Sequence, residues 1–318
     1  MWFRNIQVCQ FEKTISYQPE RLEQELHHHA FKPCTAVSPI TSGFVPPVGD
    51  SEDAPLVYGT QGYMVFCMKT QQKLLPASVL REQHKEKVKA LEDKLGKKIS
   101  RNEKQQMKEE LEHTLLSKAF SRSNTTYAYV DTHNNRLIID SSNKNTLEAF
   151  YKLAGVVFAE YTLQPLTLQS PSAILTSWLR DQAHPDCFSI LDNCSLEHTS
   201  EQKGKARFSK IDLYSDSVQS MLTEGSRVTG LSLNWADKMH FTIKEDFSIA
   251  SVKFLDEIRD LAKDGIAEGY EERFAADFFI MAQTIAEFLI DVLPEFIDEN
   301  AENKPASSTV SAEEAIMA

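Results

Sequence analysis

Lysine and arginine side chains are concentrated between Gln71 and Arg122, in a chain that is otherwise acidic. This segment holds 13 of the chain's 34 Lys and Arg residues but only 8 of its 46 Asp and Glu residues, a local balance of +5. The remaining residues include 21 Lys and Arg and 38 Asp and Glu, a balance of −17. Cations gathered in this way suit the phosphate backbone of nucleic acids, where they supply affinity without reading sequence. Exposed helices are also rich in Lys and Glu for solubility alone, so this simpler interpretation stays open.

The spacing of apolar residues in this basic segment predicts a hairpin of two amphipathic helices. One face of the first helix is formed by Leu80, His84, Val88, Leu91 and Leu95, which recur every three or four residues. Gly96 is a plausible end for that helix. Ser100 and Glu103 have the spacing of a capping box, which predicts where the second helix begins.

The tip of the predicted hairpin carries five cations that we expect to contact DNA phosphates. They are Lys94, Lys97, Lys98, Arg101 and Lys104. Phosphate contacts of this kind position a protein on DNA but do not select a sequence.

Hydrophobic patterns outside the basic segment predict an α+β fold with antiparallel sheets and C-terminal helices. Residues 63–68 form a continuous apolar run, as in a buried strand, and residues 231–235 and 239–243 alternate as in a β-hairpin. Residues 255–297 are helical in pattern and acidic. The Gly- and Pro-rich segment 43–49 predicts a rigid loop.

We expect five segments along the chain. They are the N-terminal part of a central α+β domain (1–70), the basic helical hairpin (71–122), an α+β central region (123–225), a β-hairpin with acidic helices (226–298) and a disordered tail (299–318).

Signatures of catalysis are scarce, and we expect no enzyme, no cofactor and no metal site. The glycine-rich phosphate patterns GxxxxGK[ST] and GxGxxG and the nucleophile pattern GxSxG do not occur in the sequence. Asp131 and Asp140 would suit a metal-dependent nuclease only if they share a site, and aspartates at strand ends commonly cap turns instead. Three consecutive histidines, 27–29, lie near Cys34, but neighbouring helical residues point in different directions, which disfavours a metal site.

Composition predicts a cytoplasmic protein without a membrane segment. Five cysteines are scattered without CxxC spacing, as expected of reduced thiols in the cytosol. No apolar run reaches the roughly 18 residues that span a bilayer, and no signal-peptide pattern is apparent at the N-terminus.

Phe120 lies in a polar stretch between Lys118 and Arg122, just past the end of the second predicted helix. Two interpretations are open. The ring either anchors the helix end in the core or makes an aromatic contact at a junction between subunits.

Several short segments, in the same order along the chain, carry a resemblance to a known family. They are residues 1–5, 30–34, 43–47, 73–76, 115–122, 231–241 and 274–278. With them, the chain resembles the recombination-associated RdgC family over nearly its whole length, to about residue 298. The resemblance implies a DNA-binding protein of the nucleoid without enzymatic activity, which binds single- and double-stranded DNA with little sequence preference and restrains the RecA recombinase. It also implies a ring-shaped homodimer with a basic central hole, so that the acidic surface lies outside.

The resemblance places family roles on particular residues. It implies a subunit junction at Phe120 and DNA contacts at Lys97, Lys98 and Lys210. Two neighbours of Lys210 depart from the family, Ser209 where a basic residue is common and Ile211 where a polar one is. Further candidate DNA contacts are Lys118, Arg122 and Arg207, while Lys203 and Lys205 are possible substitutes near Lys210.

A different class of function stays open beside DNA binding. In that alternative the chain is a protein-interaction regulator of recombination, with RecA as the candidate partner. The basic hairpin and the acidic C-terminal helices would then bind proteins, and DNA binding would be incidental.

Overall fold

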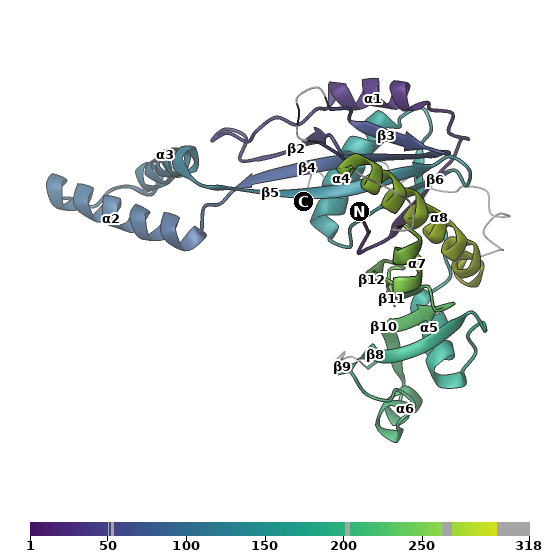
Figure 1. The fold of residues 1–318 in the computed structure, drawn as a ribbon. Coiled ribbons are helices and arrows are strands. Elements are labelled where there is room, and N and C mark those ends of the chain that lie inside the picture. The colour runs from purple at the N-terminus through teal and green to yellow at the C-terminus, as the bar shows by residue number, and fades with distance from the viewer. Residues whose placement is uncertain (50, 52–53, 201–203, 263–268, 298–318) are drawn as a thin grey trace. The chain divides into compact units, whose positions relative to one another are not determined.

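The chain folds into two compact units (Figure 1). A computed structural model describes residues 1–318 except 50, 52–53, 201–203, 263–268 and 298–318. Among the described residues, the first unit contains Met1, residues 3–164 and residues 269–279. The second unit contains Trp2, residues 165–262 and residues 280–297. The predicted disordered tail, 299–318, lies outside the described residues.

A seven-stranded sheet forms the centre of the first unit, in the order β2-β4-β5-β6-β1-β7 with β3 paired to β4. The strands are β1 (Gln7–Phe11), β2 (Ile40–Val45), β3 (Val57–Thr60), β4 (Tyr63–Lys73), β5 (Ser121–Asp131), β6 (Arg136–Ile139) and β7 (Leu163–Pro165). The central pairs, β4 with β5 and β5 with β6, are antiparallel. The continuous apolar run at the start of β4 reflects burial on both faces of the sheet.

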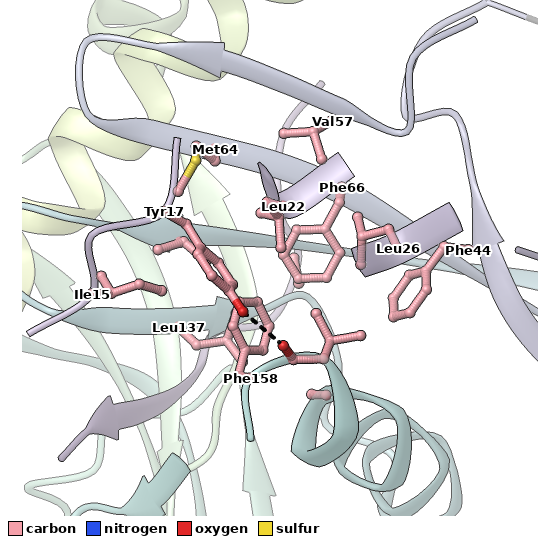
Figure 2. Close-up of a cluster of buried hydrophobic side chains, with 14 of the residues drawn as sticks. Ile15, Tyr17, Leu22, Leu26, Phe44, Val57, Met64, Phe66, Leu137 and Phe158 are labelled. Carbon is pink, nitrogen blue, oxygen red and sulfur yellow. Dashed lines mark hydrogen bonds between the residues drawn. The ribbon is translucent and has the colours of Figure 1, made fainter. Parts of the chain in front are cut away.

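One face of this sheet packs on α1 (Pro19–His28) and α4 (Lys144–Val157). Figure 2 shows the resulting cluster, in which Leu22 of α1 lies with Phe66 of β4 and Phe158 at the end of α4. Tyr17 is buried there, and its hydroxyl donates to the Val157 carbonyl at 3.1 Å. This core holds the strands that carry the basic hairpin.

The opposite face of the sheet is covered by the start of the long helix α8 (Tyr270–Phe296). Residues 270–279 of α8 belong to the first unit. Phe278 packs against Tyr129 of β5 with ring centroids 5.6 Å apart, and both side chains are fully buried. The helical pattern predicted within residues 255–297 is confirmed for this helix.

The basic segment forms two helices, α2 (Ala77–Leu95) and α3 (Arg101–Lys118), between β4 and β5. The two strands remain paired up to Lys73 and Ser121, so the hairpin continues from the end of the sheet. Gly96 ends α2 in the left-handed conformation with φ 63°, which glycine adopts without strain. The capping box of Ser100 and Glu103 is present at the start of α3, as predicted.

The second unit contains a five-stranded antiparallel sheet in the order β12-β11-β10-β8-β9. Its elements are α5 (Pro171–Asp181), β8 (Phe188–His198), β9 (Lys205–Ser209), α6 (Asp216–Thr223), β10 (Ser226–Trp235), β11 (Met239–Lys244), β12 (Ile249–Phe254) and α7 (Asp256–Leu261). Residues 280–296 of α8 pack on this unit. The Trp235 indole donates to Asp291 at 2.8 Å, and Phe288 lies 4.8 Å from the Phe241 ring.

The predicted α+β class is confirmed, with antiparallel sheets, a helical hairpin and a C-terminal helix. The β-hairpin of residues 231–243 is also confirmed. The rigid loop predicted at 43–49 is wrong in its first part, because Gly43 begins the last half of β2. A Cβ at Gly43 would lie 2.4 Å from the Phe31 Cα, so this glycine permits a close backbone approach that the local sequence does not reveal. Among the described residues, no helix has the length and apolarity needed to cross a bilayer.

Candidate nucleic-acid interface

The hairpin tip displays four of its five predicted cations to solvent. Lys94 closes the last turn of α2, Lys97 and Lys98 lie in the connection, and Arg101 is the first residue of α3. All four side chains are exposed. Within the described part of the chain, no carboxylate lies at ion-pairing distance from any of them. The turn that joins the helices therefore carries a group of exposed cations without direct ion pairs among the described residues, although Lys98 and Lys97 lie near enough to Glu92 and Glu103 to lower the pKa of those carboxyls slightly.

Lys104, the fifth predicted cation, is partly occupied in holding the hairpin together. Its Nζ lies 2.7 Å from Glu92 Oε1 on the facing helix, and its carbonyl oxygen lies 2.8 Å from His84 Nε2. Glu92 also accepts from the Ile99 backbone N–H at 3.1 Å. The hydrogen bond from Lys104 is the main cause that lowers the pKa of Glu92, and the Ile99 bond adds to it. We conclude that Lys104 has a structural role that its neighbours in the tip do not share.

Phe120 lies on the surface at the base of the hairpin. Its side chain is 85% exposed, so the interpretation of this ring as a core anchor is wrong. Its backbone is nevertheless well held, since the Phe120 carbonyl accepts from the Leu74 N–H at 2.8 Å. Leu74 is itself 48% exposed, and the flanking Lys118 and Arg122 are exposed as well. A large apolar ring thus projects from a fixed backbone between two cations.

The second predicted basic group lies in the second unit, on the edge strand β9 and the turn after it. Arg207 and Lys210 are exposed, and Lys210 has a left-handed backbone with φ 57°. Lys203 lies outside the described residues. The structure thus brings the candidate residues together in separate groups, the hairpin in one unit and β9 in the other.

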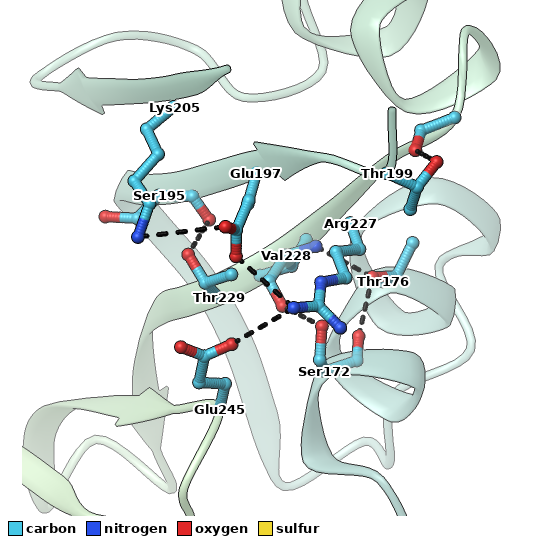
Figure 3. Close-up of polar contacts among 11 residues, drawn as sticks. Ser172, Thr176, Ser195, Glu197, Thr199, Lys205, Arg227, Val228, Thr229 and Glu245 are labelled. Atoms are coloured by element: carbon cyan, nitrogen blue, oxygen red, sulfur yellow. Dashed lines mark hydrogen bonds and ion pairs between the residues drawn. The ribbon is translucent and has the colours of Figure 1, made fainter. Parts of the chain in front are cut away.

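Lys205 belongs to a network of ion pairs, which Figure 3 shows. Its Nζ lies 3.8 Å from Glu197, a carboxylate that also pairs with Arg227 at 3.3 Å. Arg227 in turn lies 3.7 Å from Glu245. The Glu197 side chain is only 9% exposed, so these cations compensate a buried charge. Lys205 is therefore a weaker candidate for DNA contact than Arg207 or Lys210.

Asp131 and Asp140, which were considered as nuclease residues, each cap a different backbone segment. Asp131 accepts from the N–H groups of His133 and Asn134 at 3.0 and 3.1 Å, at the turn between β5 and β6. Asp140 accepts from the N–H groups of Arg4 and Asn5 at 3.0 and 2.8 Å. Burial raises the pKa of Asp140, and these hydrogen bonds oppose the rise.

The histidines and cysteines show no metal-binding arrangement within the described residues. No group of three or more His, Cys, Asp or Glu side chains there has the geometry to hold a metal ion. The five cysteines are free thiols, and four of them are buried.

One surface feature was missed in the sequence, a groove in the second unit beside Lys210. Its lining comes from β8, from the turn after β9 and from β11. The residues that meet there are far apart in the chain, so no local pattern in the sequence predicts the groove.

The fold and the hairpin define an α+β protein with a basic helical projection. The family model described as "Putative exonuclease, RdgC" matches residues 1–299. Curated relatives named recombination-associated protein RdgC include one from Tolumonas auensis, 32% identical over 303 residues, which are 95% of this chain and 100% of the relative. The relative from Yersinia pestis (strain Pestoides F) is 31% identical over 294 residues, 92% of this chain and 97% of its own length. The chain belongs to the RdgC family.

Proposed function

We propose that this protein binds DNA without sequence preference, mainly through lysine and arginine contacts to phosphates at the hairpin tip. The observation that carries the proposal is the group of exposed cations formed by Lys94, Lys97, Lys98 and Arg101, none of which makes a direct ion pair with the part of the chain that the structure describes. Long, flexible cationic side chains on a helical hairpin suit the phosphates of single- and double-stranded DNA alike, since neither needs base readout. Arg207 and Lys210 are a second set of phosphate contacts in this proposal.

The proposal extends to a homodimer that closes into a ring around DNA. Phe120 supports it, because a ring that is 85% exposed on a fixed backbone gains most from burial against another surface. A closed ring also reconciles DNA binding with a net charge of −12, because the basic groups line the hole while acidic surface faces outward. Screening over about 8 Å at physiological salt keeps the distant acidic surface from cancelling the tip charges.

The cellular role that we propose is restraint of homologous recombination on the nucleoid, in the cytoplasm. The name shared by the curated relatives supports an association with recombination. In this account the protein limits RecA by occupying DNA, so RecA need not be contacted directly.

The binding site is tested by reversing three charges at the tip, Lys97→Glu, Lys98→Glu and Arg101→Glu. We expect weaker binding to every DNA sequence by a similar factor, because these side chains bind phosphates rather than bases. A matched control reverses Lys13, Lys144 and Lys152, which are exposed in the same unit and outside the hairpin. The control changes the net charge equally, so an equal decrease in affinity in the two variants would overturn the assignment to the tip. A decrease confined to one sequence would contradict nonspecific binding.

The same tip variant separates restraint through DNA from a protein-interaction role. RecA-catalysed strand exchange should no longer be inhibited when the tip is reversed, while the control variant should inhibit it like the unmodified protein. Strong inhibition by a variant that does not bind DNA would favour the alternative, a regulator that acts on RecA itself.

We also propose that the protein does not cleave DNA. The separate capping roles of Asp131 and Asp140 support this, since each carboxylate accepts hydrogen bonds from a different backbone segment. End-labelled single- and double-stranded DNA should stay intact with the protein and Mg²⁺. Cleavage that is abolished in an Asp140→Asn variant would contradict the proposal and support the exonuclease named in the family description.

A further inference from the structure

The groove beside Lys210 is a defined feature of the second unit, with a volume of about 530 Å³. It lies over the β8 residues 190–192, and the turn between β9 and α6 forms its other wall together with His240 of β11. The full lining is Ile190, Leu191, Asp192, Ile211, Asp212, Leu213, Tyr214 and His240.

Two hydrogen bonds from backbone N–H groups hold the wall of this groove in place. The Ile211 N–H donates to the Asp192 carbonyl at 3.3 Å, which ties the turn to β8. The Tyr214 N–H donates to Asp212 Oδ1 at 2.9 Å, and Leu213 between them is 2% exposed and anchors the turn in the core. The groove is therefore preformed, and a ligand would not have to order it.

The exposed side chains of the groove have mixed chemistry. Tyr214 is 41% exposed and Ile211 36%, so aromatic and apolar surface faces water there. Asp192 and Asp212 add carboxylate oxygens, which accept hydrogen bonds from amino groups. Arg207 lies on β9 and Lys210 begins the turn, so two exposed cations are close to this wall of the groove in the chain. A matching ligand has a flat ring, an amino group and an attached phosphate.

We propose that this groove binds an unpaired base of single-stranded DNA, which stacks on Tyr214 while Lys210 and Arg207 contact the adjoining phosphates. The proposal rests on the proposed function and adds a contact that duplex DNA cannot make, because paired bases are stacked inside the helix. Stacking on aromatic side chains tolerates any base, and the two carboxylates add a preference for bases that carry an amino group, which thymine lacks. In this setting Ile211 provides an apolar surface next to the base.

The test compares three ligands of equal length with the full chain: oligo-dC, whose base carries an amino group, a strand with abasic sites in place of the bases, and a duplex. Tyr214→Ala should weaken oligo-dC binding by roughly fivefold or more, since stacking contributes about 1–3 kcal/mol per base. It should leave the affinities for the abasic strand and the duplex unchanged. Tyr214→Phe keeps the ring and should bind oligo-dC normally. Tyr270→Ala, which removes a ring that is 76% exposed in the other unit, is the matched control.

An equal decrease in affinity for all three ligands with Tyr214→Ala, or no decrease for oligo-dC, would overturn the proposal. A second measurement does not depend on how that variant folds. The unmodified protein is photocrosslinked to a strand containing 5-iododeoxycytidine, and the adduct should map to residues 211–214 or His240. If adducts map only to other residues, the assignment of the base to this groove is overturned. Binding to duplex DNA would in that case still support the proposed function. Absence of binding to any DNA would overturn both.

Discussion

Lys104 Nζ lies 2.7 Å from Glu92 Oε1, and this ion pair joins the two helices of the basic hairpin. The same carboxylate accepts from the Ile99 backbone in the connection, so one side chain of α2 orders both the turn and the start of α3. Glu92 therefore holds the turn that carries the cations proposed to bind DNA.

Removing the cation of this pair should loosen the turn locally. In Lys104→Ala the Glu92 carboxylate no longer has its partner on α3, and we expect the Ile99 amide hydrogen to exchange roughly two- to fivefold faster, the range for partly exposed ion pairs. Lys104→Arg should keep the protection, because a cation is retained. Hydrogen exchange measured by NMR decides the point, and unchanged exchange in the alanine variant would contradict the structural role of Lys104.

Acid should open the hairpin tip. The pKa of Glu92 is lowered mainly by the Lys104 hydrogen bond, and that of Glu103 mainly by the hydrogen bond from Ser100. Carboxylates with a lowered pKa stabilise the folded form above their ordinary pKa, near 4.5, and lose that contribution as the pH falls through the folded value. Tip amide protection should therefore decrease as the pH falls below about 4.5. In Ser100→Ala, the decrease in tip amide protection with falling pH should be smaller. Constant protection down to pH 3 in the unmodified protein would refute the prediction that acid opens the tip.

Alkali should destabilise the protein through its buried thiols. Burial raises the pKa of Cys67 to about 12 and that of Cys194 to about 11. Unfolded thiols ionise near pH 9, so the folded form holds protons that the unfolded form releases. The free energy of unfolding should decrease above pH 9, by at most about 1.4 kcal/mol per pH unit for each thiol.

Urea unfolding between pH 8.5 and 10 measures this effect. A variant with Cys67→Ala and Cys194→Ala has lower stability throughout, because it leaves cavities, but its dependence on pH should be flatter. If the free energy of unfolding falls with pH at the same slope in both proteins, groups other than these two thiols cause the decrease.

Phe120→Ala should weaken a subunit junction without harming the fold. Because the ring is 85% exposed in the single chain, its removal costs little folding stability, whereas an aromatic anchor at an interface commonly contributes 2 kcal/mol or more. The dissociation constant of the proposed dimer should rise about tenfold or more. Sedimentation over a concentration series provides the measurement, with Tyr270→Ala as the exposed aromatic control. Equal association of the Phe120→Ala variant and the unmodified protein would remove this role.

The hairpin could be predicted from sequence because its signals are local. Gly96 and the Ser100–Glu103 capping box act within a few residues, and both have the predicted geometry. The strand β2 and the groove at Tyr214 could not be predicted in this way. Gly43 is required by the approach of Phe31, and the groove combines β8, β11 and the turn after β9. Such contacts depend on how distant segments pack, which a periodic pattern does not contain.

The exposure of Phe120 marks a second limit of sequence reasoning. A phenylalanine past a helix end fits a core anchor and a surface contact equally well in the sequence. Only the position of the paired strands β4 and β5 places the ring outside.

The central claim, phosphate binding by the hairpin tip, is tested most directly by DNA affinity across a salt series. Fluorescence anisotropy on unrelated duplex and single-stranded sequences should give similar affinities that fall linearly with salt on logarithmic axes. The variant with Lys97, Lys98 and Arg101 reversed should show a slope smaller by about 2–3, one unit for each phosphate that the tip no longer neutralises. Absence of binding at low salt, or an unchanged slope in this variant, would contradict the account.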